Sequence, residues 1–471
     1  MISHSMSKQK FIALLFLLIS ASYLRAQTST IKGIAPDYAG MELPVFTFSD
    51  FISEEKTELG KIHFQADGTF SVAISLPTTT VCFTEFDIYQ AMIYVEPGKT
   101  YEIQFPPRQV QSEAQKRNPF FKLQPVWFRI VNQSDDDINL KIKNFETEFR
   151  VLEDKHFYDI YEKHSKASVE TVRVELQKKF PKSENKFFEA HKKYRMGNLE
   201  FALNQGKSPD FIATYFGKVS PMLTLPAYTD LFQQMFSNYF SFLGNSVHDQ
   251  KITGLVNSGE VQVLENYLTE KNSWNTDFCQ LLILKSLKDA YFSGQFSKQA
   301  IIRAFSQVEK TNWNDRNKRI ARNVLKDITY LTVGSKAPKI EVQQINGKKL
   351  TLDEFRGKFV YLHFTDLQNP ICRQHMDALK PIADQFRENL VVVFLTEGKT
   401  PDAEARKWTG IFATSDETCK NAYKVKTFPT SYLVNRKGKF AESPALNPLN
   451  GFASQLRKIL EKDRIEKLRG K

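Results

Sequence analysis

The chain has 471 residues, of which 41% are hydrophobic and 13% aromatic, so it can build two or three packed domains. Its 20 Gly and 19 Pro exclude a fibrous or largely disordered protein. The net charge of +12 does not indicate a nucleic-acid-binding protein, because Lys and Arg are interleaved with Asp and Glu, and we expect no nucleic-acid partner.

The first 26 residues differ in composition from the rest. Lys8 and Lys10 precede an apolar run from Phe11 to Ala21, and Ala26 is a small residue at a plausible cleavage site. This order is typical of a signal peptide, and the run is too short to cross a hydrocarbon core of about 30 Å as a helix. We therefore expect residues 1–26 to be a signal peptide and the protein to be exported, with an uncleaved anchor as the alternative.

Two further expectations concern the membrane. No cysteine follows the expected cleavage site, which argues against a lipid anchor, and no later segment is long and apolar enough to span a bilayer. The expected location is the periplasm of a Gram-negative cell envelope.

Residues 27–111 have the pattern of a small antiparallel β-sandwich. Short runs rich in Val, Ile, Phe, Thr and Tyr alternate with turn signals such as ADG and EPGK. About seven strands are expected. The stretch YVEPGKTYEIQF resembles the β-domain that precedes thioredoxin domains in some Gram-negative envelope proteins.

Residues 112–332 have a helical period. Phe145, Phe149 and Leu152 recur at helical spacing, and LLILKSLKDAYFSG predicts a buried helix that ends at Gly294. The aromatic run LFQQMFSNYFSFLG indicates core packing and not a cofactor pocket. We expect an all-α middle domain and no cofactor.

Residues 333–471 change pattern again. A strand and a turn at Asn346-Gly347 are followed by a second strand, a short helix and an apolar strand from Phe359 to Phe364. After this strand we expect a helix from Pro370 to Arg387, a strand from Leu390 to Thr396, a further helix and a hairpin. This order predicts a mixed sheet covered by helices. The whole chain is thus expected to be multidomain α+β, with a C-terminal α/β/α domain.

Four separated stretches of this region carry a family resemblance. They are VGSKAP, NGKKLTLDEFRGKFVYLHF, PICRQHMDALKPI and VKTFPTSYLVNRKGK. Together they resemble the TlpA/ResA-like branch of the thioredoxin superfamily, in the AhpC/TSA group. The resemblance implies a thioredoxin-like fold over residues 333–471 and a cis-proline at Pro429, followed by Thr430.

The active-site stretch departs from that family. Members have W-C-x-x-C-R after the central strand, and the first cysteine attacks the substrate disulfide. Here the resemblance puts Gln368 at the tryptophan position, Asn369 at the first cysteine and Cys372 at the second. Asn is a favoured helix N-cap and Pro370 suits the first helical position, so the helix is expected to begin normally. A two-cysteine reductase mechanism at this motif is excluded, because release of a mixed disulfide needs a second thiol.

Several other chemistries remain open for Cys372, which is expected to be partly covered one turn inside the helix. It is the remaining candidate catalytic residue, and with it the protein could act as a one-cysteine thiol-disulfide oxidoreductase. In a peroxiredoxin-like peroxidase, P-x-x-x-T/S-x-x-C would be needed, but Thr365 and Asn369 replace the proline and the Thr or Ser. A disulfide with Cys419 is another alternative, if the two lie within bridging distance.

Histidines near Cys372 raise a further alternative. Cys372 and His375, at i and i+3, share a helix face and could form a thiolate–imidazole pair or part of a metal site. A metal site needs more ligands, so none is expected. His363 on the central strand is interpreted as a hydrogen-bonded core histidine. Cys82 and Cys279, in apolar surroundings, are interpreted as small hydrophobic residues.

The function favoured by the sequence is binding. By the resemblance, Phe428 and Pro429 would face the helix start at Asn369 and Pro370, next to Thr430, and could hold an extended peptide by strand addition. Packing of Phe428 against the helix is the alternative. We therefore expect a non-catalytic or weakly redox-active scaffold or peptide-binding module, whose partner is an extended peptide or another envelope protein.

Overall fold

The computed structural model describes residues 26–112, 114–115, 118, 121–203, 208–246, 251–398 and 402–470. Residues 1–25 of the expected signal peptide lie outside this set. The chain divides into two compact units. One contains the described residues of Met1–Ser112 and Lys122–Leu325, and the other contains those of Glu113–Phe121 and Lys326–Lys471. The expected β-sandwich and helical regions therefore fall within one unit.

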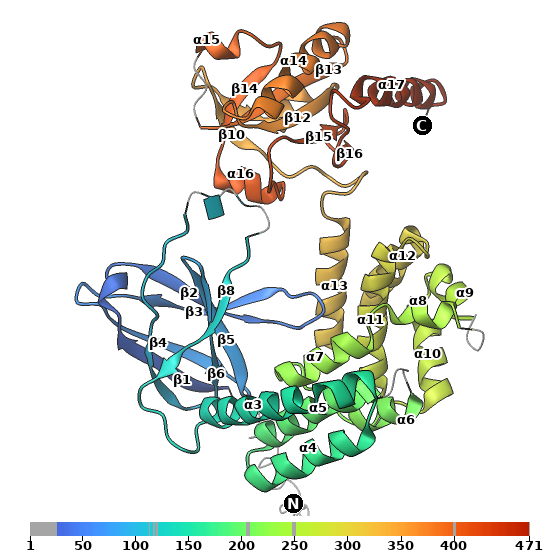
Figure 1. Ribbon diagram of the computed structural model, residues 1–471. Coiled ribbons are helices and arrows are strands. Elements are labelled where there is room, and N and C mark those ends of the chain that lie inside the picture. The colour runs from blue at the N-terminus through green and yellow to red at the C-terminus, as the bar shows by residue number, and fades with distance from the viewer. Residues whose placement is uncertain are drawn as a thin grey trace, which may run out of the picture. The chain divides into compact units, whose positions relative to one another are not determined.

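The N-terminal part of the first unit is a sandwich of two β-sheets (Figure 1). The strand order is β4-β1-β7-β9 in one sheet and β3-β2-β5-β6-β8 in the other. In β4, buried Phe70, Val72, Ile74 and Leu76 alternate with solvent-facing residues, as a half-buried strand requires. The strands are β1 Gln27–Ile34, β2 Glu42–Phe48, β3 Lys56–His63, β4 Thr69–Leu76, β5 Thr80–Phe86, β6 Tyr89–Val95, β7 Thr100–Gln104, β8 Gln124–Trp127 and β9 Arg129–Ile130; the short helix η1 is Pro36–Tyr38.

The sandwich extends beyond the boundary expected at residue 111. Strands β8 and β9 lie in the region expected to be all-α, and they add one strand to each sheet. β8 runs parallel to β6, with Tyr89 opposite Gln124. Pro125 is tolerated because β8 is an edge strand, where one row of backbone groups needs no partner strand. The sequence did not predict β8 because a four-residue strand with a proline has no local periodicity. Only its pairing with a distant strand identifies it.

Helices make up the rest of the first unit (Figure 1). Phe145, Phe149 and Leu152 of α3 are buried in a shared core, as their spacing predicts. The helix α11 is buried on nearly all sides and ends at Gly294, where φ is 74°. The helices are α3 Ile138–Lys155, η2 Tyr158–Glu162, α4 Lys166–Lys179, α5 Lys186–Leu203, α6 Pro209–Ile212, η3 Ala213–Gly217, α7 Pro226–Met235, α8 Tyr239–Gly244, α9 Lys251–Ser258, α10 Val261–Asn272, α11 Thr276–Ser293, α12 Lys298–Gln307, η4 Val308–Lys310 and α13 Asp315–Thr329, the last four residues of which belong to the second unit.

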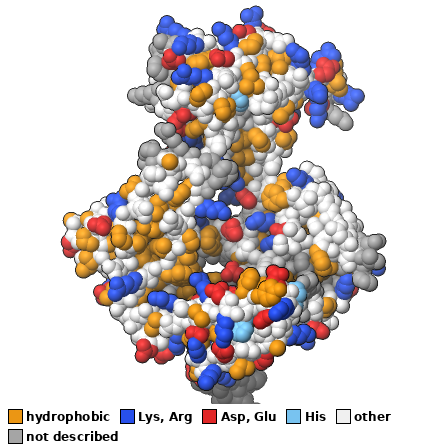
Figure 2. All heavy atoms as spheres, viewed as in Figure 1, with side chains coloured by type: hydrophobic (Ala, Val, Ile, Leu, Met, Phe, Trp, Pro, Cys, Tyr) orange, Lys and Arg blue, Asp and Glu red, His pale blue; other side chains and the backbone are white. Residues whose placement is uncertain are grey.

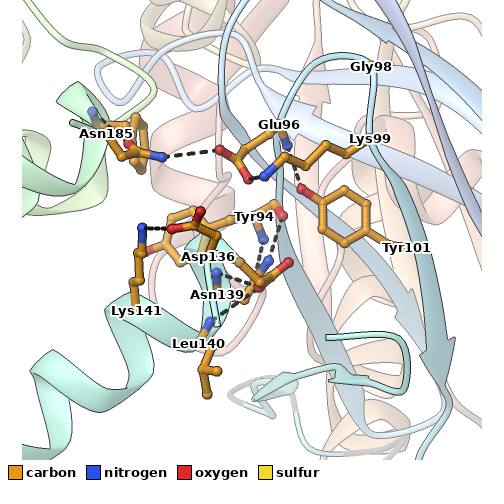
Figure 3. A network of polar contacts seen from close by, with 12 residues as sticks. Tyr94, Glu96, Gly98, Lys99, Tyr101, Asp136, Asn139, Leu140, Lys141 and Asn185 are labelled. Atoms are coloured by element: carbon orange, nitrogen blue, oxygen red, sulfur yellow. Dashed lines mark hydrogen bonds and ion pairs between the residues drawn. The ribbon is translucent and has the colours of Figure 1, made fainter. Parts of the chain in front are cut away.

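A network of polar contacts joins the sandwich to the helices (Figure 3). The Asn139 side chain accepts a hydrogen bond from the Tyr94 backbone N–H (2.8 Å) and donates one to the Tyr94 carbonyl (2.9 Å). The pairing of β8 with β6 ends at Met92, so Asn139 takes the place of a neighbouring strand at Tyr94. Asn185 adds a hydrogen bond to Glu96 (3.2 Å). The buried backbone groups of Tyr94, near the end of β6, are thereby satisfied by a side chain of α3.

The second unit is built on a seven-stranded mixed sheet of order β11-β10-β14-β13-β12-β15-β16. β12 is central and buried along its whole length; it pairs in parallel with β13 and antiparallel with β15. Helices α14 and α17 pack on one face of the sheet, and α16 packs on the other. The elements are β10 Glu341–Gln344, β11 Lys349–Thr351, η5 Leu352–Phe355, β12 Phe359–Thr365, α14 Pro370–Gln385, β13 Leu390–Glu397, α15 Asp402–Ala405, β14 Ile411–Ser415, α16 Glu417–Ala422, β15 Thr430–Val434, β16 Phe440–Glu442 and α17 Phe452–Leu468.

The distribution of charge on the surface and the lengths of the helices agree with what the sequence predicts. On the face shown in Figure 2, Lys and Arg side chains lie among Asp and Glu side chains. Among the described residues, every helix is too short or too polar to cross a membrane.

Candidate functional site

The candidate site is the start of α14, directly after the central strand β12. Asn369 is the N-cap residue: its side-chain oxygen accepts a hydrogen bond from the Ile371 backbone N–H at 2.9 Å, and its backbone is extended. Pro370 occupies the first turn, where its missing N–H costs no hydrogen bond. Such a cap contributes about 1 kcal/mol to stability, so the helix start is well formed without a sulfur at residue 369.

The segment before β15 lies against this helix start. The Phe428–Pro429 peptide bond is cis, and the Asn369 side-chain nitrogen lies 3.5 Å from the Phe428 carbonyl oxygen. Phe428 is partly buried against one core of the unit, and the Thr430 hydroxyl donates to the Thr427 carbonyl at 2.6 Å. Among the predicted binding residues, the structure brings Asn369 and Phe428 into contact.

Exposed apolar surface adjoins this contact. Pro370 is exposed, and Ile371 is 56% exposed although it is a large aliphatic residue. Both belong to the first turn of α14. The helix start therefore offers a polar amide next to an apolar patch.

Cys372 is more deeply covered than the sequence suggests. It is 0% exposed, and its thiol is free. Burial raises the pKa of the Cys372 thiol, although the Asp366 backbone and the Thr365 hydroxyl act in the opposite direction. The thiolate, which is the reactive form, is therefore a minor species near neutral pH.

The other three cysteines are also buried and free, so the structure contains no disulfide between Cys372 and Cys419. Burial raises the pKa of the thiol to about 12 in Cys82, Cys279 and Cys419. Cys82 and Cys279 each belong to a packed interior, at 0% exposure.

Two buried histidines lie close together, one on β12 and one on α14. His363 on β12 shares a hydrogen bond of 2.8 Å, through Nδ1, with the Ser431 hydroxyl on β15. The His363 ring lies 5.9 Å from the ring of His375 on α14. Nε2 of His363 and Nδ1 of His375 have no hydrogen-bond partner among the described residues. Burial, together with the neighbouring His375, lowers the pKa of His363 to about 3, and burial also lowers the pKa of His375, so both rings are neutral at pH 7.

The sequence suggested the location of His363 but missed its surroundings. Ser431 contacts His363 because β12 and β15 pair in one register, and a single sequence does not reveal register. Thr365 donates to the Met376 sulfur at 3.6 Å in the same buried region. Part of these surroundings was predictable from the sequence: His375 and Met376, three and four positions after Cys372, must share its face of the helix. Among the described residues, no group of three or more His, Cys, Asp or Glu could hold a metal ion.

Comparisons with known proteins match about a quarter of the chain. Residues 333–443 match the AhpC/TSA family model. A thioredoxin-like protein, YneN, from Bacillus subtilis is 26% identical over 136 residues, which cover 27% of this chain and 77% of that protein. The thiol-disulfide oxidoreductase ResA from Bacillus thuringiensis is 24% identical over 123 residues, which cover 25% of this chain and 71% of that protein.

Solved structures also match about a quarter of the chain. One is the thioredoxin domain of a thiol-disulfide oxidoreductase from Bacteroides vulgatus, with 20% identity and a TM-score of 0.25; the match covers 27% of this chain and 97% of that one. Another is described as a thiol:disulfide interchange protein DsbE from Chlorobium tepidum, with 26% identity and a TM-score of 0.22; the match covers 24% of this chain and 83% of that one. Residues 333–443 therefore resemble the AhpC/TSA thioredoxin-like family, and thiol-disulfide oxidoreductases are among the relatives of the chain at low identity.

Proposed function

We propose that this thioredoxin-like region binds an extended polypeptide and lacks dithiol catalysis. The observation that carries the proposal is the Asn369 side chain, which caps α14 and contacts the Phe428 carbonyl where the family has its attacking sulfur. An amide at that position supports binding by hydrogen bonds, and it cannot form a mixed disulfide.

The state of the remaining thiol supports the loss of chemistry. Thiol–disulfide exchange needs an accessible thiolate and then a second thiol to release the product. Cys372 is 0% exposed, and burial raises the pKa of its thiol. A one-cysteine oxidoreductase or a peroxiredoxin-like peroxidase is the competing class, and either would need the helix start to open before Cys372 could react.

The site has what strand addition needs. A distance of 3.5 Å is at the limit for a hydrogen bond, so the N–H of an incoming peptide can displace the Asn369 amide from the Phe428 carbonyl. The exposed Pro370 and Ile371 then offer apolar contact for one peptide side chain. Main-chain bonds provide affinity and the apolar contact provides selection, as in other strand-addition sites.

Thiol chemistry is tested by insulin reduction with dithiothreitol as the electron donor. The purified protein is expected to give the rate of dithiothreitol alone, and Cys372→Ala is expected to give the same rate. Native Cys372 is also expected to resist iodoacetamide at pH 7 and to react fully in denaturant. A protein-dependent rate that disappears in Cys372→Ala would establish the competing class, as would peroxide consumption that depends on Cys372.

Peptide binding is tested separately with a fluorescent, carboxymethylated insulin B chain, which has no free thiol. Ile371→Asp is expected to weaken binding about tenfold, because it places a charge in the apolar contact. Ile345→Asp is the matched control, since Ile345 is 38% exposed and lies in the turn between β10 and β11, away from the helix start. Equal affinities for the two variants, or no binding by the unaltered protein, would contradict the binding proposal.

We also propose that the protein is exported to the periplasm after removal of residues 1–26. Support comes from the basic start and the short apolar run from Phe11 to Ala21. Expression of the full chain in a Gram-negative host, followed by osmotic shock and intact-mass measurement, is expected to give a periplasmic product that begins at Gln27. A cytoplasmic product with an uncut N-terminus would contradict this proposal.

A further inference from the structure

A pocket in the helical part of the first unit has no role in the function proposed above. It lies among α3, α4, α5 and η3, and its volume is about 240 Å³. Of these elements, α3, α4 and α5 pack against one another (Figure 1). Its apolar lining is formed by Phe145, Leu176, Phe180 and Met196, of which Phe145, Leu176 and Met196 are buried.

Three cations line the same pocket, but two of them are already neutralised. Lys192 pairs with Glu189 at 2.7 Å and donates to the carbonyls of Phe180 and Pro181. Arg173 pairs through Nε with Glu170 at 3.1 Å, and through Nη2 with Glu200.

Lys193 is different, because no described carboxylate pairs with it. Its ammonium donates to the Thr214 carbonyl at 3.1 Å and lies 5.4 Å from the centre of the Tyr215 ring. An ammonium group has three N–H donors, so donors remain for a ligand. Arg173 also has a terminal nitrogen, Nη1, for which no hydrogen bond is recorded among the described residues. The pocket thus combines an apolar floor, the Lys192–Glu189 ion pair and, at its solvent-exposed side chain Lys193, a cation that pairs with no described carboxylate.

We propose that this pocket binds a small carboxylate with a short apolar chain, held by Lys193 and contacted by Arg173. The carboxylate would supply the counter-ion that Lys193 lacks, and the chain would cover Leu176 and Met196. Glu200 beside Arg173 disfavours a doubly charged anion, so one negative charge is the best match. A volume below the roughly 300–1,000 Å³ typical of drug-sized ligands limits the chain to a short one. Lys193 is exposed to solvent, and partial desolvation lowers the pKa of its ammonium group.

The test is calorimetric titration of the full protein with octanoate. Saturable binding to one site is expected, with at least about tenfold weaker binding in Lys193→Gln, because one charge-assisted hydrogen bond is lost. Lys193→Arg is expected to retain most of the affinity. Lys178→Gln is the matched control, since Lys178 is an exposed lysine of α4 outside the pocket. Thermal melts of each variant establish that it is folded.

Two further measurements locate the site and identify the recognised group. The labelled methyl signal of Met196, assigned with Met196→Leu, is expected to shift when octanoate is added. Octanol, which has the same chain and a neutral head, is expected to bind more weakly. The proposal is wrong if octanoate does not bind saturably, if Lys193→Gln binds as tightly as the unaltered protein, if octanol equals octanoate, or if only other methionines shift.

Discussion

In the function proposed above, the side chain at residue 369 decides the chemistry of the thioredoxin-like region. Asn369 lies at the helix N-terminus, where the helix dipole would lower the pKa of a thiol. Cys372 is three residues further on in the same helix. We therefore expect that a cysteine introduced at residue 369 would form a working dithiol with Cys372 without any other change.

The first prediction is that Asn369→Cys gains insulin reductase activity about tenfold or more above the unaltered protein, because it gains both an attacking thiolate and a resolving partner. The rate of insulin precipitation with dithiothreitol measures this gain. Asn369→Ser keeps a cap of similar quality and is expected to gain nothing. If Asn369→Cys is no faster than Asn369→Ser, the helix start does not have the geometry of a redox motif.

The buried histidines give the second prediction, which concerns pH. Because their pKa values are lowered in the folded state, the unfolded chain binds more protons below pH 6.5. The stability contributed by the neutral rings is thus present above pH 6.5. It is lost as the pH falls, for His363 down to its folded-state pKa of about 3. One excess proton in the unfolded chain lowers the free energy of unfolding by about 1.4 kcal/mol per pH unit.

Urea unfolding of the second unit between pH 7 and pH 4 measures that slope. His363→Asn removes one titrating ring, so its free energy of unfolding is expected to depend less steeply on pH, whatever its absolute stability. His63→Gln, at an exposed residue of the first unit, should leave the slope of the second unit unchanged. Identical slopes for His363→Asn and the unaltered protein would show that His363 is not kept neutral by burial.

At the scale of elements, the contact of α3 with β6 is the most informative. Asn139 satisfies both backbone groups of Tyr94, which is 4% exposed, so their loss would leave a buried donor and a buried acceptor unpaired. We expect Asn139→Ala to lower the free energy of unfolding of the first unit by about 2–4 kcal/mol. Urea titration followed by circular dichroism measures this loss.

The control uses a neighbouring polar contact of another kind. Lys141→Ala breaks an ion pair with Asp136, whose side chain is 91% exposed, and should cost less than about 1 kcal/mol. If the two alanine variants are equally stable, water replaces the Asn139 amide at no cost, and the contact does not support the junction.

The elements also show how far sequence reasoning reaches. Alternation predicts β4 and helical spacing predicts α3, because each pattern is local and each element buries one face. The cap at Asn369 was equally predictable, since it depends on adjacent residues. β8 and the contact of His363 with Ser431 were not predictable, because each depends on a partner strand that is distant in the sequence.

At the scale of the whole molecule, two compact units make up the chain where three domains were expected from the sequence. The sandwich and the helices share contacts such as Phe51 with Phe232, whose rings are 5.0 Å apart, and the bond from Lys288 to the Ile52 carbonyl. Packing of this kind couples the stability of the two parts, so they are expected to unfold together.

The fourth prediction follows: differential scanning calorimetry should show two transitions and not three. Asn139→Ala should shift only the transition of the first unit, and His363→Asn only that of the second. A fragment of residues 326–471 is expected to melt cooperatively near one of the two temperatures. Three transitions, or a shift of both by one substitution, would contradict the division into two units.

The placement of the four sulfurs has a practical consequence. Cys82 lies in the sandwich, Cys279 in α11, and Cys372 and Cys419 in the second unit, and each is at most 5% exposed. A maleimide reagent can therefore label each thiol only when its surroundings open. Labelling rates read by peptide mass spectrometry would give the opening equilibrium of each region in the same sample, without any introduced probe.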